Sequence, residues 1–314
     1  MLIAFTIPVS MRIFIAGVNG MARKTVLITG ATSGIGFAGA EALGRKGWRV
    51  LVHGRNAARL DPAIAELQSR VPEGQFEGVT GDLTSLASVA DLVRQVRTKT
   101  ASLDALWNNA GGMNTSFVTT VDGLESQMAV NFIAPFALTR LLFALLLAAP
   151  QGRIVTTSSM AHVFAPRRIE DWLVPGGKRY RPMAVYGQSK LATLLFTEEF
   201  ARRIGQGSVT INAYHPGFVR SGFGSGGDPQ KKGSFAFASF LALSPEKGAD
   251  TGVWLVDDPE VQSLTGSYWL KRRQKKPSSA VAPETARLVW DKAETAIQKT
   301  LGTLPILERG QSGK

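Results

Sequence analysis

Two side chains that could together transfer a proton lie four positions apart in the stretch AVYGQSKLATLLF, residues 184–196. This stretch is typical of a helix, and residues four apart on a helix share one face, so the phenol of Tyr186 should lie beside the ammonium of Lys190. A cation about 4 Å from a phenol, at an effective dielectric of ~20, favours the phenolate by roughly 4 kcal/mol, or up to ~3 pKa units before desolvation. The pair therefore predicts general acid–base chemistry, although the same spacing is also an ordinary helix stabiliser.

A glycine-rich turn, TGATSGIG at 29–36, stands between a predicted strand and a predicted helix. Glycines allow a tight turn and let the backbone approach a phosphate, and the helix N-terminus offers free N–H groups to a pyrophosphate. The strand–turn–helix context favours a dinucleotide site over a simple packing turn. The candidate cofactor contacts in this turn are Gly30, Ser33, Gly34, Ile35 and Gly36.

The end of the second predicted strand, VHGRN at 52–56, bears on the choice of cofactor. A carboxylate there would bind the ribose 2′-hydroxyl of NAD, but the stretch holds no acid. Arg55 is placed to meet a 2′-phosphate through charge-assisted hydrogen bonds, which predicts NADP(H). The alternative is an ordinary exposed arginine.

Strands and helices alternate from residue 25 onward. Strands are expected at 24–30, 48–54, 76–83, 103–111, 152–159, 208–217 and 266–270, and helices near 35–46, 57–70, 85–98 and 131–148, with another that carries Tyr186. This alternation predicts an α/β fold: a single-domain, Rossmann-type, doubly wound parallel sheet with helices on both faces. We expect an apolar N-terminal extension at 1–23, the dinucleotide-binding domain at 24–302 and a tail at 303–314.

Two long irregular segments, 163–183 and 218–235, follow strands at the edge where open α/β sheets bind ligands. Their aromatic side chains suit an apolar ligand, although aromatic residues in such loops often only pack the loops together. Those in and just beyond these segments are Phe164, Trp172, Phe218, Phe223, Phe235 and Phe237.

These motifs and several others occur in the order typical of the short-chain dehydrogenase/reductase family, which the chain resembles over residues 25–270. They are TGATSGIG, GDL with Asp82, NNAG at 108–111, AVNFIAPFALT with Asn131, RIVTTSS ending at Ser159, YGQSK, and HPGFVRS at 215–221. The stretch around Tyr186 and the tail TGSYWLKRRQKKPSS look most like the retinol-dehydrogenase-like branch. The spacing from Ser159 to Tyr186 is longer than the family's commonest spacing.

The resemblance implies a role for each matching residue. Tyr186 would exchange the proton, Ser159 would hydrogen-bond the substrate oxygen in preference to its neighbour Ser158, Lys190 would bind the ribose and lower the Tyr186 pKa, and Asn131 would complete a water-mediated relay. Further cofactor contacts would come from Asp82, Leu83, Asn109, Ala110, Gly111, Pro216, Gly217, Val219 and Ser221. The expected function is NADP(H)-dependent interconversion of a carbonyl and an alcohol. The alternative is a non-catalytic nucleotide-binding sensor or scaffold of the same fold.

Composition limits the other classes of function. The chain has no cysteine, so disulfides and thiolate chemistry are excluded, and its three histidines form no metal-type cluster. The net charge of +12 includes the run KRRQKK at 271–276, but no nucleic-acid motif accompanies it, so a solvated basic surface is favoured. We therefore expect a small-molecule partner, no nucleic acid and no metal, with a homo-oligomer as an option.

The first 20 residues are apolar but lack a basic region ahead of the apolar run, and Pro8 and Arg12 interrupt that run. This pattern favours neither a signal peptide nor a spanning helix. An upstream start codon, with Met21 as the alternative start, is the favoured interpretation, and a membrane-surface anchor is the less favoured one. The expected location is cytoplasmic.

Overall fold

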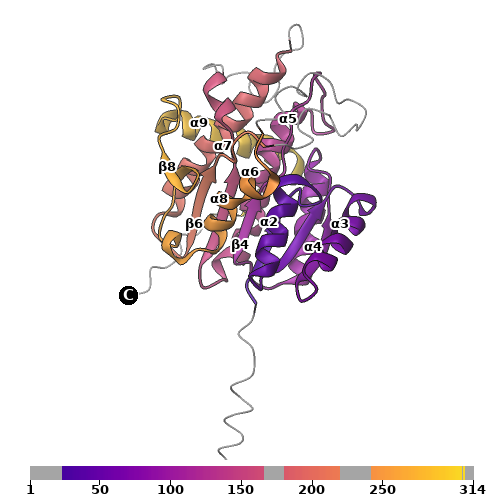
Figure 1. Cartoon of the computed structure of the whole chain (residues 1–314). Coiled ribbons are helices and arrows are strands. Elements are labelled where there is room, and N and C mark those ends of the chain that lie inside the picture. The colour runs from indigo at the N-terminus through magenta and orange to yellow at the C-terminus, as the bar shows by residue number, and fades with distance from the viewer. Residues whose placement is uncertain (1–22, 166–179, 220–241, 306, 308–314) are drawn as a thin grey trace, which may run out of the picture.

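The computed structural model describes residues 23–165, 180–219, 242–305 and 307. One eight-stranded sheet in the order β3-β2-β1-β4-β5-β6-β7-β8 runs through its centre (Figure 1). Neighbouring strands from β3 to β7 are parallel, and β8 pairs antiparallel with β7. The strands are β1 Thr25–Ile28, β2 Arg49–Gly54, β3 Gln75–Thr80, β4 Ala105–Asn108, β5 Gly152–Thr157, β6 Val209–Tyr214, β7 Ser267–Leu270 and β8 Arg273–Lys275. The predicted parallel sheet is confirmed.

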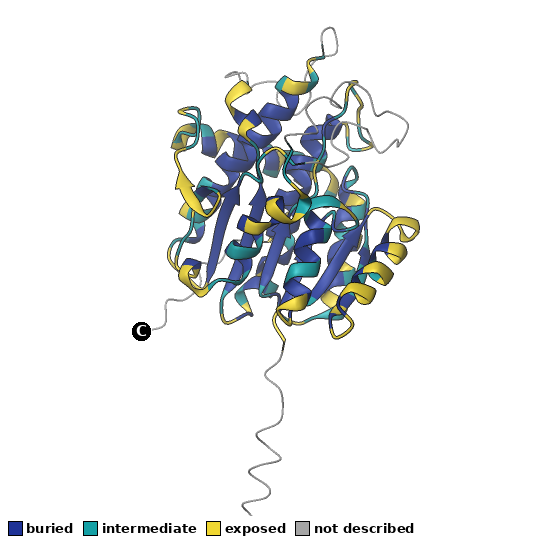
Figure 2. Cartoon of the chain, viewed as in Figure 1, coloured by how far each residue is buried: buried dark blue, intermediate teal, exposed yellow. Residues whose placement is uncertain are grey.

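The central strands are apolar on both faces because helices cover both faces. One apolar cluster lies between the sheet and α2 (Gly34–Arg45), α3 (Ala57–Arg70) and α8 (Pro245–Asp257). A second cluster lies on the opposite face, under the helices α4 Leu86–Lys99, α6 Ala134–Leu147, α7 Pro182–Ile204 and α9 Pro283–Leu301. Figure 2 shows the central strands buried, while the outer side of α3 and the strand β8 are exposed. This is the doubly wound arrangement that the alternating sequence predicts.

The helix predicted over 131–148 is longer and less regular than expected. It comprises α5 (Ser126–Met128), a π-helical turn η1 (Ala129–Ile133) and α6. The run Ser126–Leu147 is long and apolar enough to cross a membrane, but 72% of its most apolar window is buried inside the domain. Trp290 of α9 contributes to that burial, because its ring packs against Phe136 of α6. The run is therefore a core helix of this domain.

The strand β8 was not predicted from the sequence. Its connection to β7 is a two-residue turn in which Lys271 and Arg272 take φ values of 50° and 57°. Glycine or asparagine is the usual choice for such a turn, so the basic run at 271–276 hides the hairpin from sequence inspection. The side chain of Arg272 is bonded to Asp250 of α8, which holds the turn against the domain.

Candidate active site

The phenol of Tyr186 and the ammonium of Lys190 lie together in α7, as their spacing predicts. Lys190 Nζ is 5.7 Å from the centre of the Tyr186 ring. Both side chains are buried, with 7% and 3% of their surface exposed. Lys190 Nζ also donates a hydrogen bond of 2.9 Å to the backbone oxygen of Thr157, at the carboxyl end of β5. The ammonium is thus held at the edge of the sheet where parallel strands present their ligands.

Burial changes the acid–base properties of this pair. Desolvation raises the pKa of Tyr186 to about 12, against a smaller lowering from its hydrogen bond with Ser159. Desolvation also lowers the pKa of Lys190 to about 8, because the low-dielectric interior disfavours the ammonium. In the chain without cofactor, desolvation dominates and keeps the phenol protonated at neutral pH. The lowering of the Tyr186 pKa by Lys190, which was expected before desolvation is subtracted, stays a prediction.

Ser159 and its neighbour Ser158 differ clearly in their burial and their hydrogen-bond partners. Ser158 is 1% exposed, and its hydroxyl donates to the backbone oxygen of Lys190 at 3.0 Å, so it anchors β5 to α7. Ser159 is partly exposed, accepts a hydrogen bond from the Ala161 N–H at 3.2 Å and bonds through its side chain with Tyr186. Of the two hydroxyls, that of Ser159 is thus the one that bonds with the Tyr186 phenol, and its contact with a substrate oxygen stays a prediction.

A short 3-10 helix, η2 (Met160–Phe164), begins directly after Ser159 and lies against the start of α7. Gly187 makes this contact possible, because a Cβ atom there would lie 2.6 Å from the backbone oxygen of Ala161. Residue 187 therefore has to be glycine if the segment from Ser159 to Phe164, here called the serine loop, is to approach the phenol. Sequence inspection placed Gly187 in a motif but gave it no function.

Asn131 lies within the π-helical turn η1, where the Ala134 N–H bonds to the oxygen of Ala129. Its side-chain amide donates to the oxygen of Gly112 and to Ser189 Oγ, both at 2.9 Å, and its Oδ1 accepts from the Gly112 N–H. The amide of Asn131 thus fixes the loop after β4 against α7. Its backbone oxygen accepts from the Thr193 hydroxyl at 3.3 Å. The predicted proton relay through Asn131 stays a prediction.

The glycine-rich turn has the form that an anion site requires. Gly30 and Gly34 take φ values of 63° and 58°, which favour glycine, and the exposed Ser33 leaves the N-terminus of α2 without a side-chain cap or an acidic residue in its first turn. Ile35 at the same terminus approaches Gly248 of α8. Free N–H groups and the positive end of the helix dipole would suit a pyrophosphate.

His53, which lies within the strand expected at 48–54, fixes this turn. The Gly30 N–H donates to His53 Nδ1 at 3.0 Å, and His53 Nε2 lies 2.9 Å from the oxygen of Gly81. A backbone oxygen only accepts, so the ring is neutral with its proton on Nε2. Burial lowers the pKa of His53, which keeps the ring in this form. No local sequence pattern reveals this bridge between two loops.

Arg55 follows β2 directly and is exposed at the carboxyl edge of the sheet. The adjoining loop after β3 contains Asp82 and Leu83, and it is held near β2 by a bond from the Gly81 N–H to the oxygen of Gly54. The Asp82 carboxylate accepts from the N–H and hydroxyl of Thr84, so it shapes this loop. Arg55 and the loop with Asp82 and Leu83 thus lie on adjoining strand ends, and their contact with the adenosine end of a cofactor stays a prediction.

The loop after β4 continues the same edge toward Lys190. Asn109 donates to the oxygen of Thr29, and the N–H groups of Asn109 and Ala110 donate to the Thr29 hydroxyl. A Cβ atom added at Gly111 would lie 3.2 Å from Lys190 Nζ. The predicted cofactor residues of this loop therefore form a continuous line from the glycine-rich turn to the lysine.

The loop after β6 supplies the last predicted cofactor residues. Pro216 and Gly217 follow β6 after His215, and Val219 lies close to Gly248, the same α8 glycine that Ile35 approaches. The loop after β6 and the start of α2 are thereby brought together. Some predicted residues lie outside the described part of the chain: Ser221, Trp172, Phe223, Phe235 and Phe237.

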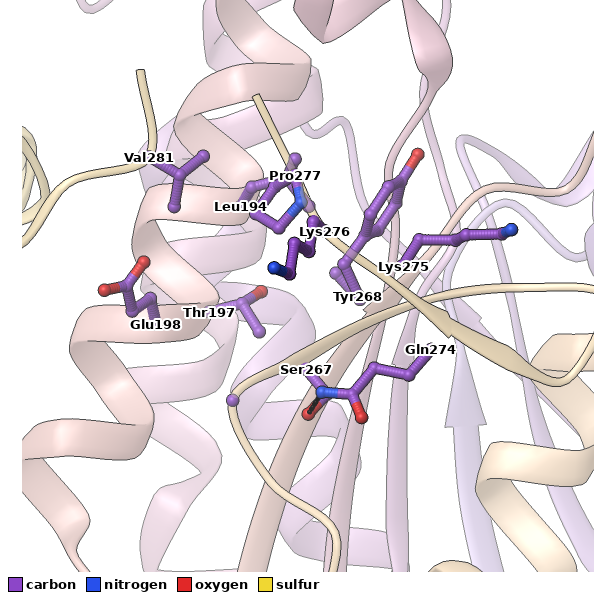
Figure 3. Close-up of a pocket in the computed structure, with 12 residues that line it drawn as sticks. Leu194, Thr197, Glu198, Ser267, Tyr268, Gln274, Lys275, Lys276, Pro277 and Val281 are labelled. Atoms are coloured by element: carbon purple, nitrogen blue, oxygen red, sulfur yellow. Dashed lines mark hydrogen bonds between the residues drawn. The ribbon is translucent and has the colours of Figure 1, made fainter. Parts of the chain in front are cut away.

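A separate pocket of about 150 Å³ lies between α7 and the β7–β8 hairpin (Figure 3). Leu194 and Val281 contribute apolar surface, and Lys276 extends across the pocket toward Thr197. It includes none of the predicted catalytic or cofactor residues. The chemistry described above therefore belongs to the carboxyl edge of the sheet and not to this pocket.

The described edge thus combines an anion-binding turn, a buried phenol, a neighbouring ammonium and a half-exposed serine hydroxyl. Such a set can bind a phosphate-containing cofactor and deliver a proton to an oxygen beside it.

Comparisons with known proteins agree with this geometry. Residues 24–171 match the family model described as short chain dehydrogenase. Human retinol dehydrogenase 14 is 35% identical over 292 residues, covering 87% of this chain and 86% of that protein. A provisionally named daunorubicin C-13 ketoreductase from Streptomyces sp. (strain C5) is 38% identical over 284 residues, covering 90% of this chain and 95% of that protein. The crystal structure of an uncharacterised Mycobacterium paratuberculosis protein superposes with a TM-score of 0.70 at 31% identity, covering 93% and 98% of the two chains.

Proposed function

This chain belongs to the short-chain dehydrogenase/reductase family, an oxidoreductase family, and from that premise we propose that it uses NADP(H) to interconvert a carbonyl and an alcohol. The observation that carries the proposal is the convergence of Ser159, Tyr186 and Lys190 at the carboxyl edge of the sheet, in line with the open N-terminus of α2. The similarity to proteins named retinol dehydrogenase and ketoreductase supports the same pair of functional groups.

A nicotinamide cofactor held between the N-terminus of α2 and Lys190 would supply the hydride for the carbonyl carbon in the direction of reduction. The Ser159 hydroxyl hydrogen-bonds the carbonyl oxygen and orients it toward Tyr186. Burial holds the phenol of Tyr186 protonated, so that it can give its proton to the oxygen as negative charge develops there. Lys190 stabilises the resulting phenolate from a ring-centre distance of 5.7 Å. Asn131 positions the adjoining loop and Ser189, and through them the start of the proposed relay.

The preference for NADP(H) over NAD(H) rests on Arg55, which is exposed after β2 where an NAD-binding protein would carry an acid. We expect Arg55→Ala to weaken NADP(H) binding by about 1.5–3 kcal/mol, the range for a hydrogen bond to a charged group, and to leave NAD(H) binding little changed. Fluorescence titration with both reduced cofactors measures this. Equal affinity of the wild type for the two cofactors would refute the assignment.

The proposed substrate is an apolar carbonyl or alcohol. Several large apolar side chains are unusually exposed on the segments around the serine and the phenol, which is typical of a surface that receives an apolar ligand. They are Met160, Phe164, Met183 and Phe218, with exposed fractions of 48%, 67%, 41% and 53%.

A panel of aliphatic and aromatic ketones and aldehydes, with NADPH oxidation followed by absorbance, tests the activity. We expect turnover by the wild type and a loss of about 10²–10⁴-fold in Tyr186→Phe, with NADPH binding retained. Binding of NADPH without turnover of any compound in the panel would support the sensor or scaffold alternative. Near-normal reduction by Tyr186→Phe would show that another group donates the proton.

We further propose a cytoplasmic location, supported by the burial of the apolar run Ser126–Leu147 inside the domain. Cell fractionation of the full chain and of a variant lacking residues 1–20 measures it. Recovery of only the full chain with membranes would instead favour the surface anchor.

A further inference from the structure

The imidazole of His162 connects the serine loop to a segment more than a hundred positions away. His162 lies in η2, three residues after Ser159, and only 3% of its surface is exposed. Its Nδ1 lies 2.7 Å from the backbone oxygen of Ser159, and its Nε2 lies 3.3 Å from the backbone nitrogen of Ser278. Ser278 belongs to the segment that joins β8 to α9.

These two contacts fix the position of the ring proton. A backbone oxygen can only accept a hydrogen bond, so Nδ1 carries the proton and donates to Ser159. A backbone N–H can only donate, so Nε2 is unprotonated and accepts from Ser278. The ring is thus neutral in one tautomer, and either substitution or a second proton would remove one of its two bonds.

The surroundings of His162 hold the ring in place. The ring of Tyr268 packs edge-on against it, with centres 5.4 Å apart and an interplanar angle of 85°. Ser278 is itself the start of a turn, because its oxygen accepts from the Val281 N–H at 2.9 Å. The same segment forms one wall of the pocket in Figure 3 through Pro277 and Val281. The chain after β8 is therefore ordered partly by a bond to the serine loop.

We infer that His162 is a positioning residue with two bonds. Its Nδ1–H holds the backbone oxygen of Ser159, which we call the clamp, and its Nε2 holds the segment 276–281 against the serine loop through the Ser278 N–H, which we call the latch. The clamp acts on the carbonyl of Ser159, while the hydroxyl of Ser159 accepts from the Ala161 N–H and bonds with Tyr186. Because the backbone oxygen and the hydroxyl of Ser159 are both held, the hydroxyl faces the phenol in one orientation. The catalytic consequence of this inference rests on the proposed function, whereas the latch itself does not.

Two substitutions separate the two bonds of His162. The amide of His162→Asn can place an N–H near the position of Nδ1, but it cannot reach Ser278. The longer side chain of His162→Gln can present its oxygen near the position of Nε2, but it leaves no donor at the position of Nδ1. His162→Phe keeps a ring and removes both bonds. Lys275→Gln, at an exposed residue of β8, is the control.

Amide hydrogen exchange of Ser278 and the imidazole ¹⁵N chemical shifts of His162 test the latch without any assay of activity. We expect Nδ1 protonated and Nε2 unprotonated at neutral pH. We expect Ser278 exchange to be about 3–10-fold faster in His162→Asn and His162→Phe, and close to wild type in His162→Gln and the control. A proton on Nε2, or unchanged exchange in His162→Phe, would overturn the latch.

Carbonyl reduction tests the clamp on Ser159. A misplacement of a reacting group costs up to about 10²-fold, so kcat should fall by about 10- to 100-fold in His162→Gln and His162→Phe and by less in His162→Asn, with the NADPH dissociation constant unchanged. Equal kcat values in all three variants and the wild type would overturn the clamp. If the wild type reduces no carbonyl, the proposed function fails, whereas the exchange and chemical-shift measurements still decide the latch.

Discussion

Replacing Lys190 with methionine removes a buried cation from beside the phenol and keeps a side chain of similar length. At the observed 5.7 Å from the ring centre and an effective dielectric of ~20, the lost attraction for a phenolate is about 3 kcal/mol, or about 2 pKa units. Burial already raises the pKa of Tyr186 to about 12. Burial also lowers the pKa of Lys190 to about 8, so the ammonium acts on the phenol below about pH 8. In that range the phenolate formed in Lys190→Met lacks this attraction, and alcohol oxidation should slow by about 10²-fold.

The assay is the pH dependence of kcat/KM for alcohol oxidation at saturating NADP⁺, with cofactor saturation checked by fluorescence. Below pH 8 we expect kcat/KM to be about 10²-fold lower in Lys190→Met and unchanged in Lys275→Met, a matched change at an exposed lysine, and we expect the difference to narrow above pH 8. A Lys190→Met enzyme with the wild-type kcat/KM below pH 8 would refute the electrostatic role of Lys190.

The stability of the same variant gives an independent measurement. Burial lowers the pKa of Lys190 from 10.5 to about 8, so between these values the unfolded chain binds more protons than the folded one. The free energy of unfolding of the wild type should accordingly gain a rising contribution from pH 8 to pH 10.5, and Lys190→Met should lose that contribution. Urea unfolding of both proteins across this range measures it, and parallel pH dependences would contradict the assigned burial of the charge.

Three further outcomes follow from the described contacts. Burial lowers the pKa of His53, His162 and His215, the last to about 4, so the unfolded chain binds more protons than the folded chain below pH 6.5. The free energy of unfolding should therefore fall as the pH drops toward 4, by up to about 3 kcal/mol for His215 alone. A free energy of unfolding that stays constant from pH 7 to pH 4 would contradict this. Gly187→Ala places a methyl group 2.6 Å from the Ala161 oxygen and should reduce carbonyl turnover by about 10- to 100-fold, while NADPH binding stays close to wild type. Unchanged turnover would show that η2 can move away from α7 without loss of activity. Deleting residues 1–20 should leave the thermal midpoint and turnover unchanged, because β1 begins at Thr25, and a large drop in either would show that this segment supports the domain.

The features that depend on local spacing can be predicted from the sequence. Tyr186 and Lys190 share a helix face because the α-helix repeats every 3.6 residues, and the glycines at 30 and 34 mark a turn that few other residues can adopt. The alternation of apolar strands and helices was enough to predict a parallel sheet, and the parallel sheet in turn predicted the edge where the ligand residues gather.

The folded structure was needed to tell which effect controls each of those groups. The direction of the Tyr186 pKa shift depends on how deeply the packing of α7 buries the phenol, and no local pattern encodes that depth. His53 and His162 each bond to two backbone groups, and one partner of each lies in a distant loop, so their neutral tautomers are visible only once the chain is folded. The π-helical turn at Asn131 and the roles of Ser158 and Ser159 likewise depend on contacts across the sheet edge, because hydrogen bonds between residues far apart in the sequence leave no periodic signal in it.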